Sequence, residues 1–445
     1  MDETKKLTFI SRSDLRGGAA IVTYRLVEAL RKEGVNARML VCEKMSDSDF
    51  VQVCSSHRHI QYSFLKERLG VYLSNGRSRK TLFKIDPALD GLPLWTHPWV
   101  KDADAIVLGW VNQGMLSLKG VKRLGSLGKP LIWIMHDMWN MTGICHHAGE
   151  CSGYRHECGD CPLLGNKAHI NDISHTTWCN KKELYDNVPI KYVAVSTWLA
   201  EKAKQSSLLR DHDIKVIPNP FPLCDTIEQE DLEGDSDNID TDIYGEIELN
   251  TGDLDKQKAD EQECGIAFGA ARLDDPIKGL PVLIKALKII SHKHPEEASR
   301  MRLVTFGETK DSTALDGIAI KHQHLGVIKG SDAIRDAYSK CNIVVSTSDF
   351  ETLPGTLIEG QAYGCIPVAL NHGGQKDIIE HRKTGWLAPW NNSESLRAEN
   401  IAEGILWAFS HRNDHEMKVR MRESVNVKFN SKNVAQRIIE FIYVK

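Results

Sequence analysis

The stretch SDFETLPGTLIEGQAYGCIPVAL, from Ser348 to Leu370, decides the fold of this chain. It follows CNIVVSTS, a β-branched apolar run that is typical of a buried strand. The loop FETLPG comes next, a helix is predicted to begin near Thr356, and CIPVAL reads as the following strand. In such a strand–loop–helix–strand unit the helix N-terminus opens at the carboxyl edge of a parallel sheet. That edge favours anions, because free helical N–H groups and the helix dipole both attract negative charge.

Two glutamates flank this loop. Glu351 precedes the predicted helix and Glu359 lies eight positions later, so we expect both to face one ligand at the sheet edge. An alternative stays open, because Thr356 and Glu359 form the pattern of a capping box, which would by itself explain Glu359. In that case 353–355, Leu-Pro-Gly, would be an ordinary turn.

The stretch resembles the Glu-x7-Glu signature of retaining GT-B glycosyltransferases (glycosyltransferase group 1), which transfer sugars from nucleotide diphosphosugars. The segments GGQKDII and TGWLAP are similar to the next elements of that family, and the resemblance extends with gaps over most of the chain. It implies an α/β protein of the GT-B class: two doubly wound Rossmann-like domains that face a cleft, with a C-terminal helix that crosses back.

The resemblance also implies roles for the loop and its two acids. Glu359 would hold the ribose hydroxyls of the nucleotide, and Glu351 would orient hydroxyls of the donor sugar. The loop residues that would bind the nucleotide, with their backbone amides on the β-phosphate, are Leu353, Pro354, Gly355 and Thr356.

Composition restricts the class of protein. A length of 445 residues predicts two or three domains, and 41% hydrophobic with 26% charged residues is ordinary for a globular protein. A net charge of -4 argues against a general nucleic-acid binder. No apolar run reaches the roughly 18 residues that span a bilayer, and MDETKKLTFISRS has no signal-peptide core. We therefore expect a cytoplasmic protein.

Charge also marks a boundary between domains. Residues 221–263 carry 16 Asp+Glu and 2 Lys+Arg with few large apolar side chains, which is typical of a solvated segment. The Asp-Thr-Asp at 240–242 is interpreted as a coincidence of this acidic run. We predict an N-terminal acceptor domain at 1–218, an acidic junction at 219–263, a nucleotide-sugar domain at 264–428 and the crossing-back helix at 429–445.

The first half alternates strands and helices, which favours a parallel sheet. Gly17 and Gly18 fall where the first strand turns into a helix predicted at 21–32, and glycine there lets a phosphate approach backbone N–H groups. A plain flexible turn is the alternative. His136 falls at the end of a strand predicted at 130–137; the resemblance implies contact with the donor sugar or the acceptor, and a structural histidine is the alternative.

Two cations follow the first strand of the second half. Arg272 and Lys278 lie six positions apart in one loop and resemble the family's Arg…Lys pair, which neutralises the donor diphosphate. Cations at that place stabilise the charge that grows on a departing diphosphate. The alternative is a pair of solvated loop cations.

Four cysteines lie within CHHAGECSGYRHECGDCP and end in a Cys-x-x-Cys. Eleven cysteines in a chain expected in the cytoplasm predict thiols or metal ligands rather than disulfides. Four thiolates in one glycine-rich loop suit tetrahedral zinc, so we predict a structural zinc site; free or redox-active thiols are the alternative. Its ligands would be Cys145, Cys151, Cys158 and Cys161.

The resemblance implies a retaining glycosyltransferase that moves a sugar from a UDP- or GDP-sugar to a glycan or lipid-linked acceptor, in polysaccharide or glycoconjugate biosynthesis. The resemblance implies that His136, Glu351, Arg272 and Lys278 carry catalysis and that no cofactor is required. The alternatives are a non-catalytic GT-B sugar-nucleotide binder, and a GT-B epimerase, glucan synthase or phosphorylase.

A basic stretch of the first domain predicts peripheral contact with the inner face of an anionic membrane. MLSLKGVKRLGSLGK interleaves cations with leucines, a pattern of membrane-surface segments. A solvated helix face is the alternative. The cations concerned are Lys119, Lys122, Arg123 and Lys129.

Overall fold

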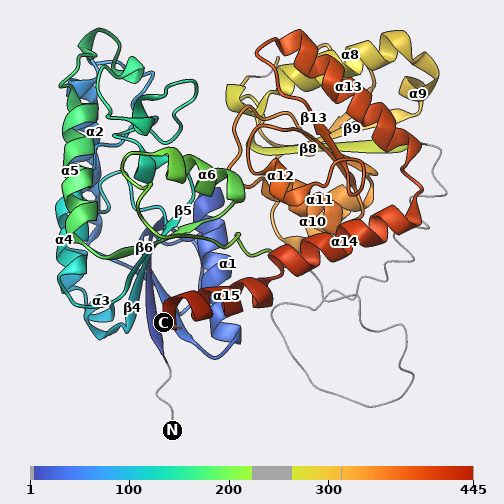
Figure 1. The fold of residues 1–445 in the computed structure, drawn as a ribbon. Coiled ribbons are helices and arrows are strands. Elements are labelled where there is room, and N and C mark those ends of the chain that lie inside the picture. The colour runs from blue at the N-terminus through green and yellow to red at the C-terminus, as the bar shows by residue number, and fades with distance from the viewer. Residues whose placement is uncertain (1–4, 223–262, 312, 444–445) are drawn as a thin grey trace, which may run out of the picture. The chain divides into compact units, whose positions relative to one another are not determined.

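The chain divides into two units (Figure 1). The structure, a computed structural model, describes residues 5–222, 263–311 and 313–443. Unit 1 comprises Met1–Pro220 with Ser431–Lys445, and unit 2 comprises Phe221–Asn430. Most of the acidic junction predicted at 219–263, with its Asp-Thr-Asp, lies outside the described residues.

Unit 1 is built on a parallel sheet of seven strands in the order β3-β2-β1-β4-β5-β6-β7. The order reverses direction between β1 and β4, which is the switch point of a Rossmann-like sheet. Both β4 and β5 are buried along their whole length, as expected for strands that are covered on two faces. The strands are β1 Lys6–Ser13, β2 Asn36–Glu43, β3 Val51–Val53, β4 Ala105–Leu108, β5 Leu131–Met135, β6 Ile190–Ala194 and β7 Ile214–Val216.

The helices of unit 1 connect these strands. The first, α1, follows β1 directly and buries an apolar stripe that includes Val22, Leu26 and Leu30. The helices are α1 Gly18–Lys32, α2 His57–Ser74, α3 Pro98–Asp102, α4 Leu118–Gly125, α5 Ile173–Asn187, α6 Thr197–Gln205 and α15 Ser431–Tyr443.

The last helix of the chain, α15, belongs to unit 1, where it lies beside α1 (Figure 1). Ile438 on α15 lines the same cavity as Val22 and Leu26 of α1. Gln436 Nε2 donates a hydrogen bond to the Glu33 carboxylate at 3.2 Å. Unit 1 is therefore discontinuous in sequence.

Unit 2 repeats the same topology with a parallel sheet in the order β10-β9-β8-β11-β12-β13, which reverses between β8 and β11. Its strands are β8 Cys264–Arg272, β9 Met301–Glu308, β10 Lys321–His324, β11 Ile343–Ser346, β12 Ile366–Leu370 and β13 Trp386–Ala388. Its helices are α8 Leu280–Lys293, α9 Pro295–Ser299, α10 Ser331–Ser339, α11 Gly355–Ala362, α12 Gln375–Ile378, α13 Glu394–Ser410 and α14 His415–Phe429.

One core cluster joins the sheet of unit 2 to α8 and α13. Leu283 and Leu287 of α8 and Ile401 and Ile405 of α13 are fully buried within it. Apolar residues spaced three or four apart on each helix make this contact possible, because such residues share one helix face. The core therefore covers the sheet and leaves its carboxyl edge to loops.

Two sequence-based interpretations are wrong. Helix α1 begins at Gly18 rather than Ile21. The capping-box alternative for Thr356 and Glu359 is also wrong, because Pro354 is the N-cap of α11 and Thr356 is already inside the helix.

Candidate functional site

The carboxyl edge of the unit 2 sheet gathers the predicted donor residues. Strands β8, β11 and β12 are neighbours and run parallel, so the loops that follow them meet at one edge. Thr347 Oγ1 donates to the carbonyl oxygens of Lys278 and Gly279 at 3.0 and 2.9 Å, and the Asp349 amide donates to Ile277 O at 2.9 Å. These bonds join the loop after β8 to the loop after β11.

The two loops bring Lys278 and Glu351 together. Lys278 Nζ donates to Glu351 Oε1 at 2.6 Å, and the two side chains are 27% and 18% exposed. The pair is thus shielded from bulk water while it still has an open side. Two residues that the sequence places 73 positions apart form one charged contact.

A close approach of two loops fixes the backbone of Glu351. The Gly374 amide donates to Glu351 O at 2.8 Å, and Glu351 also forms a bridge with Gly373. A Cβ on Gly373 would overlap this carbonyl, so only glycine fits there.

Three residues that sequence reasoning missed stabilise the loop that carries Glu351. Asp349 forms an ion pair with Arg397 of α13 at 3.0 Å, and its carbonyl lies 2.5 Å from His372 Nδ1. The His372 ring stacks on Trp390 with ring centroids 4.1 Å apart. The sequence gave no sign of the Asp349–Arg397 ion pair, because Arg397 lies in α13, far along the chain from Asp349.

Helix α11 begins directly after the Glu351 loop. Pro354 is buried, Leu353, Gly355 and Thr356 are partly exposed, and Glu359 lies in the second turn. Glu359 is near the buried Tyr338, whose pKa is raised by burial and further by the charge of this carboxylate. The predicted nucleotide-binding residues are therefore contiguous on one helix end and its loop.

Arg272 is the last residue of β8 and lies at the carboxyl edge of the unit 2 sheet. Its Nε and Nη2 both donate to Asp274 Oδ1 at 3.1 Å, and the side chain is 44% exposed. Asp274 also accepts a bond from the Lys310 amide at 3.1 Å. The guanidinium is thus held at the strand end by an acid that sequence reasoning did not single out.

In unit 1 the loop after β1 leads into an exposed helix N-terminus. Gly17 is the N-cap of α1 with a φ of 88°, and a Cβ on Gly17 or Gly18 would meet no atom within 4 Å. The buried Asp14 shapes the loop by accepting bonds from the amides of Leu15 and Met45 at 2.9 Å. Although burial opposes it, hydrogen bonds from Ser46 and Met45 lower the pKa of Asp14.

His136 lies one residue beyond β5, at the carboxyl edge of the unit 1 sheet. Its Nε2 is 3.3 Å from Thr23 Oγ1 of α1, and both residues line one small cavity with Ile217 and Pro218. Burial lowers the pKa of His136 to about 4, so the ring is neutral at pH 7. A neutral imidazole can accept or donate a hydrogen bond at Nε2, and which it does depends on the tautomer.

The next residue, Asp137, forms a buried pair that the sequence did not predict. His146 Nδ1 lies 2.8 Å from Asp137 Oδ2, and Trp110 Nε1 donates to the same oxygen at 3.0 Å. Burial opposes ionisation of Asp137, but the charge and hydrogen bond of His146 lower the pKa of this carboxyl. Burial likewise opposes the charge on His146, while Asp137 raises its pKa. His146, which follows Cys145 directly, is thus held by Asp137.

The four cysteines line one pocket in the loop between β5 and α5. Burial raises the pKa of Cys145 to about 12 and of Cys161 to about 11. Bound zinc would place four sulfurs about 3.8 Å apart, given Zn–S bonds near 2.3 Å. The four thiols surround the pocket more widely; among the described residues, the donor atoms within 4.8 Å of one another are those of Glu157, His175 and Cys179.

The chain's similarity to known proteins agrees with this geometry. Residues 253–424 match the family described as glycosyl transferases group 1. The matched residues include the carboxyl edge of the unit 2 sheet with Lys278, Glu351 and Glu359. AmsK of Erwinia amylovora, an amylovoran biosynthesis glycosyltransferase, is 28% identical over 142 residues, which cover 29% of this chain and 34% of AmsK. WcaL of Salmonella typhimurium, assigned to colanic acid biosynthesis, is 27% identical over 192 residues, which cover 39% of this chain and 44% of WcaL.

Structural similarity to a solved protein covers nearly the whole chain. The crystal structure of HepE from Anabaena in complex with UDP matches with a TM-score of 0.56 and 15% identity, covering 98% of this chain and 99% of HepE. Both Rossmann-like sheets have their counterpart there, so the fold is GT-B. The chain spans less than half the length of the curated relatives named above. Among the described residues, no helix is both long enough and apolar enough to cross a membrane.

Proposed function

We propose that this protein is a retaining glycosyltransferase that transfers a sugar from a UDP- or GDP-sugar to a glycan or lipid-linked acceptor. The observation that carries the proposal is the Lys278–Glu351 contact of 2.6 Å at the carboxyl edge of a sheet that matches glycosyl transferases group 1. A cation and an acid side by side at this edge suit a donor that has an anionic diphosphate next to a hydroxyl-rich sugar.

In the proposed reaction the donor diphosphate takes Lys278 as its counter-ion, with Arg272 adding a second positive charge. Glu351, released from Lys278, accepts hydrogen bonds from hydroxyls of the transferred sugar. As the glycosidic bond breaks, charge moves onto the leaving diphosphate, and these fixed cations stabilise it most at that moment. The α11 amides at Gly355 and Thr356 add the positive end of a helix dipole.

Glu359 is proposed to hold the ribose hydroxyls, since it follows the phosphate-binding end of α11 by one turn. Its position near Tyr338 leaves a partly exposed acid on the same helix as the loop amides. For unit 1, phosphate contact at Gly17 and Gly18 and a role of His136 beside the transferred sugar stay predictions.

The biological setting follows from the relatives. AmsK is named for amylovoran biosynthesis, WcaL is assigned to colanic acid biosynthesis, and HepE was solved with UDP. By analogy we assign this chain to bacterial polysaccharide or glycoconjugate assembly.

A structural zinc at the four cysteines is a separate proposal. Zinc bound by four thiolates carries a net charge of about −2, which is costly to bury without a counter-charge. Lys181 is placed to supply it: the residue is fully buried and donates to Trp139 O at 2.6 Å. Burial lowers the pKa of Lys181 to about 7, whereas negative charge on Cys158 and Cys145 raises it, so thiolates at this site would favour the charged lysine. The thiols would have to move together as the metal binds.

Elemental analysis tests the zinc proposal. Protein purified without added metal should contain about one zinc per chain. Cys158→Ser should lose most of it and keep donor affinity, because the donor residues lie in unit 2. Cys179→Ser is the matched control and should keep the zinc; loss of zinc in this variant alone would move the metal to the group of Glu157, His175 and Cys179.

The proposed activity is tested by release of free UDP or GDP from a panel of nucleotide sugars incubated with a mixed acceptor extract. A transferase releases the nucleotide only with the right donor and acceptor, and the product retains the anomeric configuration of the donor. Lys278→Ala is the matched inactive variant. A nucleotide that binds but is never released from its sugar would identify a non-catalytic GT-B binder instead.

A further inference from the structure

Helix α2 of unit 1 exposes a continuous apolar stripe. Six of the fourteen large apolar side chains that are exposed among the described residues lie between residues 62 and 89. Four of them are on α2 itself, and at 100° per residue they fall within about 80° of one another, on one helix face. They are Tyr62, Leu65, Leu69 and Leu73, each more than half exposed.

Two further side chains widen this stripe. Leu89 lies against α2, since its Cδ1 is 2.7 Å from the place where a Cβ on Gly70 would be. Phe83 lies beside the same helix, with its ring centroid 5.8 Å from the guanidinium carbon of Arg68. Both are more than half exposed. We call Tyr62, Leu65, Leu69, Leu73, Phe83 and Leu89 the α2 patch.

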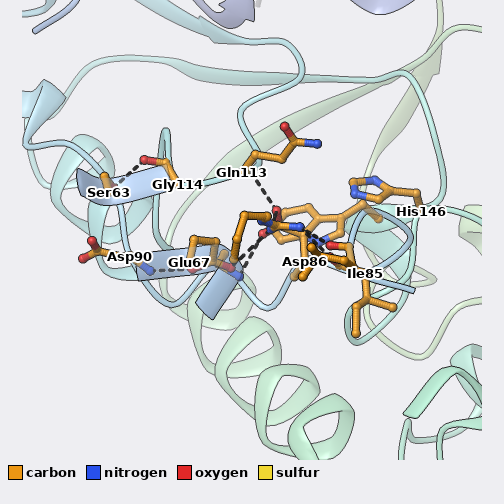
Figure 2. A network of polar contacts seen from close by, with 12 residues as sticks. Ser63, Glu67, Ile85, Asp86, Asp90, Gln113, Gly114 and His146 are labelled. Carbon is orange, nitrogen blue, oxygen red and sulfur yellow. Dashed lines mark hydrogen bonds and ion pairs between the residues drawn. The ribbon is translucent and has the colours of Figure 1, made fainter. Parts of the chain in front are cut away.

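The buried side of α2 holds the patch outward (Figure 2). Ser63 Oγ donates to Gly114 O at 2.7 Å, and the Asp90 amide donates to Glu67 at 2.9 Å. Arg68 donates to Asp86 Oδ2 at 2.7 Å. These buried polar contacts are costly to break, so α2 cannot rotate its leucines inward.

The charge around the α2 patch is positive. Residues 57–84 include one acid, Glu67, and it is fully buried. The next acid on the surface, Asp90, is paired with Lys66 at 3.2 Å. The same segment, residues 57–84, exposes six cations: Arg58, Lys66, Arg77, Arg79, Lys80 and Lys84.

We propose that the α2 patch docks unit 1 onto the surface of an anionic lipid bilayer. Apolar side chains that project from a cationic surface match the two layers of such a membrane, acyl chains beneath anionic headgroups. A second copy of this chain fits less well, because a two-fold interface would set the cations of one patch against those of the other. This inference goes beyond sugar transfer and places the protein where a lipid-linked acceptor resides.

The surface differs from the basic stretch that the sequence offered as a candidate for membrane contact. Helix α4 does expose Lys119, Lys122 and Arg123. Of the leucines in that stretch, however, Leu116 and Leu124 are buried, and Leu118 and Leu127 are only partly exposed. The stretch therefore offers less apolar surface to a bilayer than the α2 patch does.

Vesicle co-sedimentation with the full chain tests the proposal. The protein should bind phosphatidylcholine vesicles that contain phosphatidylglycerol, bind poorly to phosphatidylcholine alone, and dissociate as salt is raised. Leu65→Ser/Leu69→Ser should weaken binding about tenfold or more. Arg79→Gln/Lys80→Gln should weaken it about fivefold for each charge removed.

The matched control is Val327→Ser/Leu396→Ser, which removes two exposed apolar side chains from unit 2. It should bind vesicles like the wild type, and thermal unfolding should show all variants folded. Equal binding by every variant, or equal binding to neutral vesicles, overturns the proposal. The proposal is also overturned if the wild-type protein is a dimer that does not bind vesicles and if Leu65→Ser/Leu69→Ser makes it monomeric. Vesicle binding needs no nucleotide, so failure of the transfer assay leaves this result independent.

Discussion

Replacing Glu351 by glutamine should tighten the binding of a free nucleoside diphosphate while it slows sugar transfer. In the structure Lys278 Nζ is 2.6 Å from Glu351 Oε1, so a diphosphate must compete with Glu351 for this cation. Glutamine has the same shape but no charge. The substitution therefore frees Lys278 and removes a negative charge from the phosphate site at the same time.

The magnitude follows from the exposure of the pair. With side chains 27% and 18% exposed, solvent screens the contact only in part, so a charge-assisted bond worth about 1.5–3 kcal/mol applies. The glutamine oxygen still accepts a neutral bond from Lys278, which retains part of that energy. The net gain in diphosphate affinity should be about 1–2 kcal/mol, a factor of about 5–30.

Calorimetric titration with UDP and GDP measures this gain. The gain should vanish in a Lys278→Ala background, which itself should bind the diphosphate about one to two decades more weakly. Asp349→Asn is the matched control. It also removes one negative charge, two residues from Glu351, but Asp349 pairs with Arg397 and not with Lys278. If Glu351→Gln gives no tighter binding, or gives the same gain without Lys278, the pair does not form the phosphate site.

Three other outcomes are expected. Glu359→Ala should weaken nucleotide affinity by calorimetry about 10–100-fold, whereas the exposed Glu399→Ala should not; equal affinities would show that the ribose site is elsewhere. Gly279→Ala should lower the free energy of unfolding in urea by about 2 kcal/mol or more, because φ is 67° and a Cβ would overlap a carbonyl. Gly128 has a φ of 70° but open space around a Cβ, so Gly128→Ala should lower the free energy of unfolding by only about 1 kcal/mol. An equal loss in Gly279→Ala and Gly128→Ala would contradict the overlap at Gly279. Because burial lowers the pKa of His136 from 6.5 to about 4, the unfolded chain binds the proton more readily, so its contribution to stability is present above pH 6.5 and is lost as pH falls. When the free energy of unfolding in urea is measured from pH 6.5 down to about pH 4, His136→Asn should lose about 1–3 kcal/mol less than the wild type. If the two proteins lose stability in parallel as pH falls, this reasoning is contradicted.

The fold class could be predicted because its signal is local. The apolar runs at β11 and β12 are short, β-branched and separated by a helix-length segment, and the structure pairs them in parallel as the pattern predicts. Element ends were harder to predict. Gly17 and Gly18 read as loop residues, yet α1 begins at Gly18 because the neighbouring turns of the helix bury enough apolar surface to hold it.

The candidate site shows the same limit. Lys278 and Glu351 could be named from their motifs, but their direct contact depends on the loop bonds from Thr347 that no local pattern encodes. Asp137 and His146 lie nine residues apart around a turn, and only the fold shows that they pair. The α2 patch was missed because its leucines have ordinary helical spacing. Spacing predicts that they share one helix face, but only the structure shows that this face is exposed rather than buried in the core.

The return of α15 to unit 1 has a consequence for synthesis of the chain. Until residues 431–443 have been made, the face of α1 that carries Val22 and Leu26 lacks the cover that Ile438 gives it, although every strand of its sheet has already left the ribosome. Unit 2, which is continuous in sequence, can complete its own core earlier. The emerging protein thus passes through a stage with one finished half and one half that waits for its final helix, and this stage is the one at which chaperones have an apolar surface to bind.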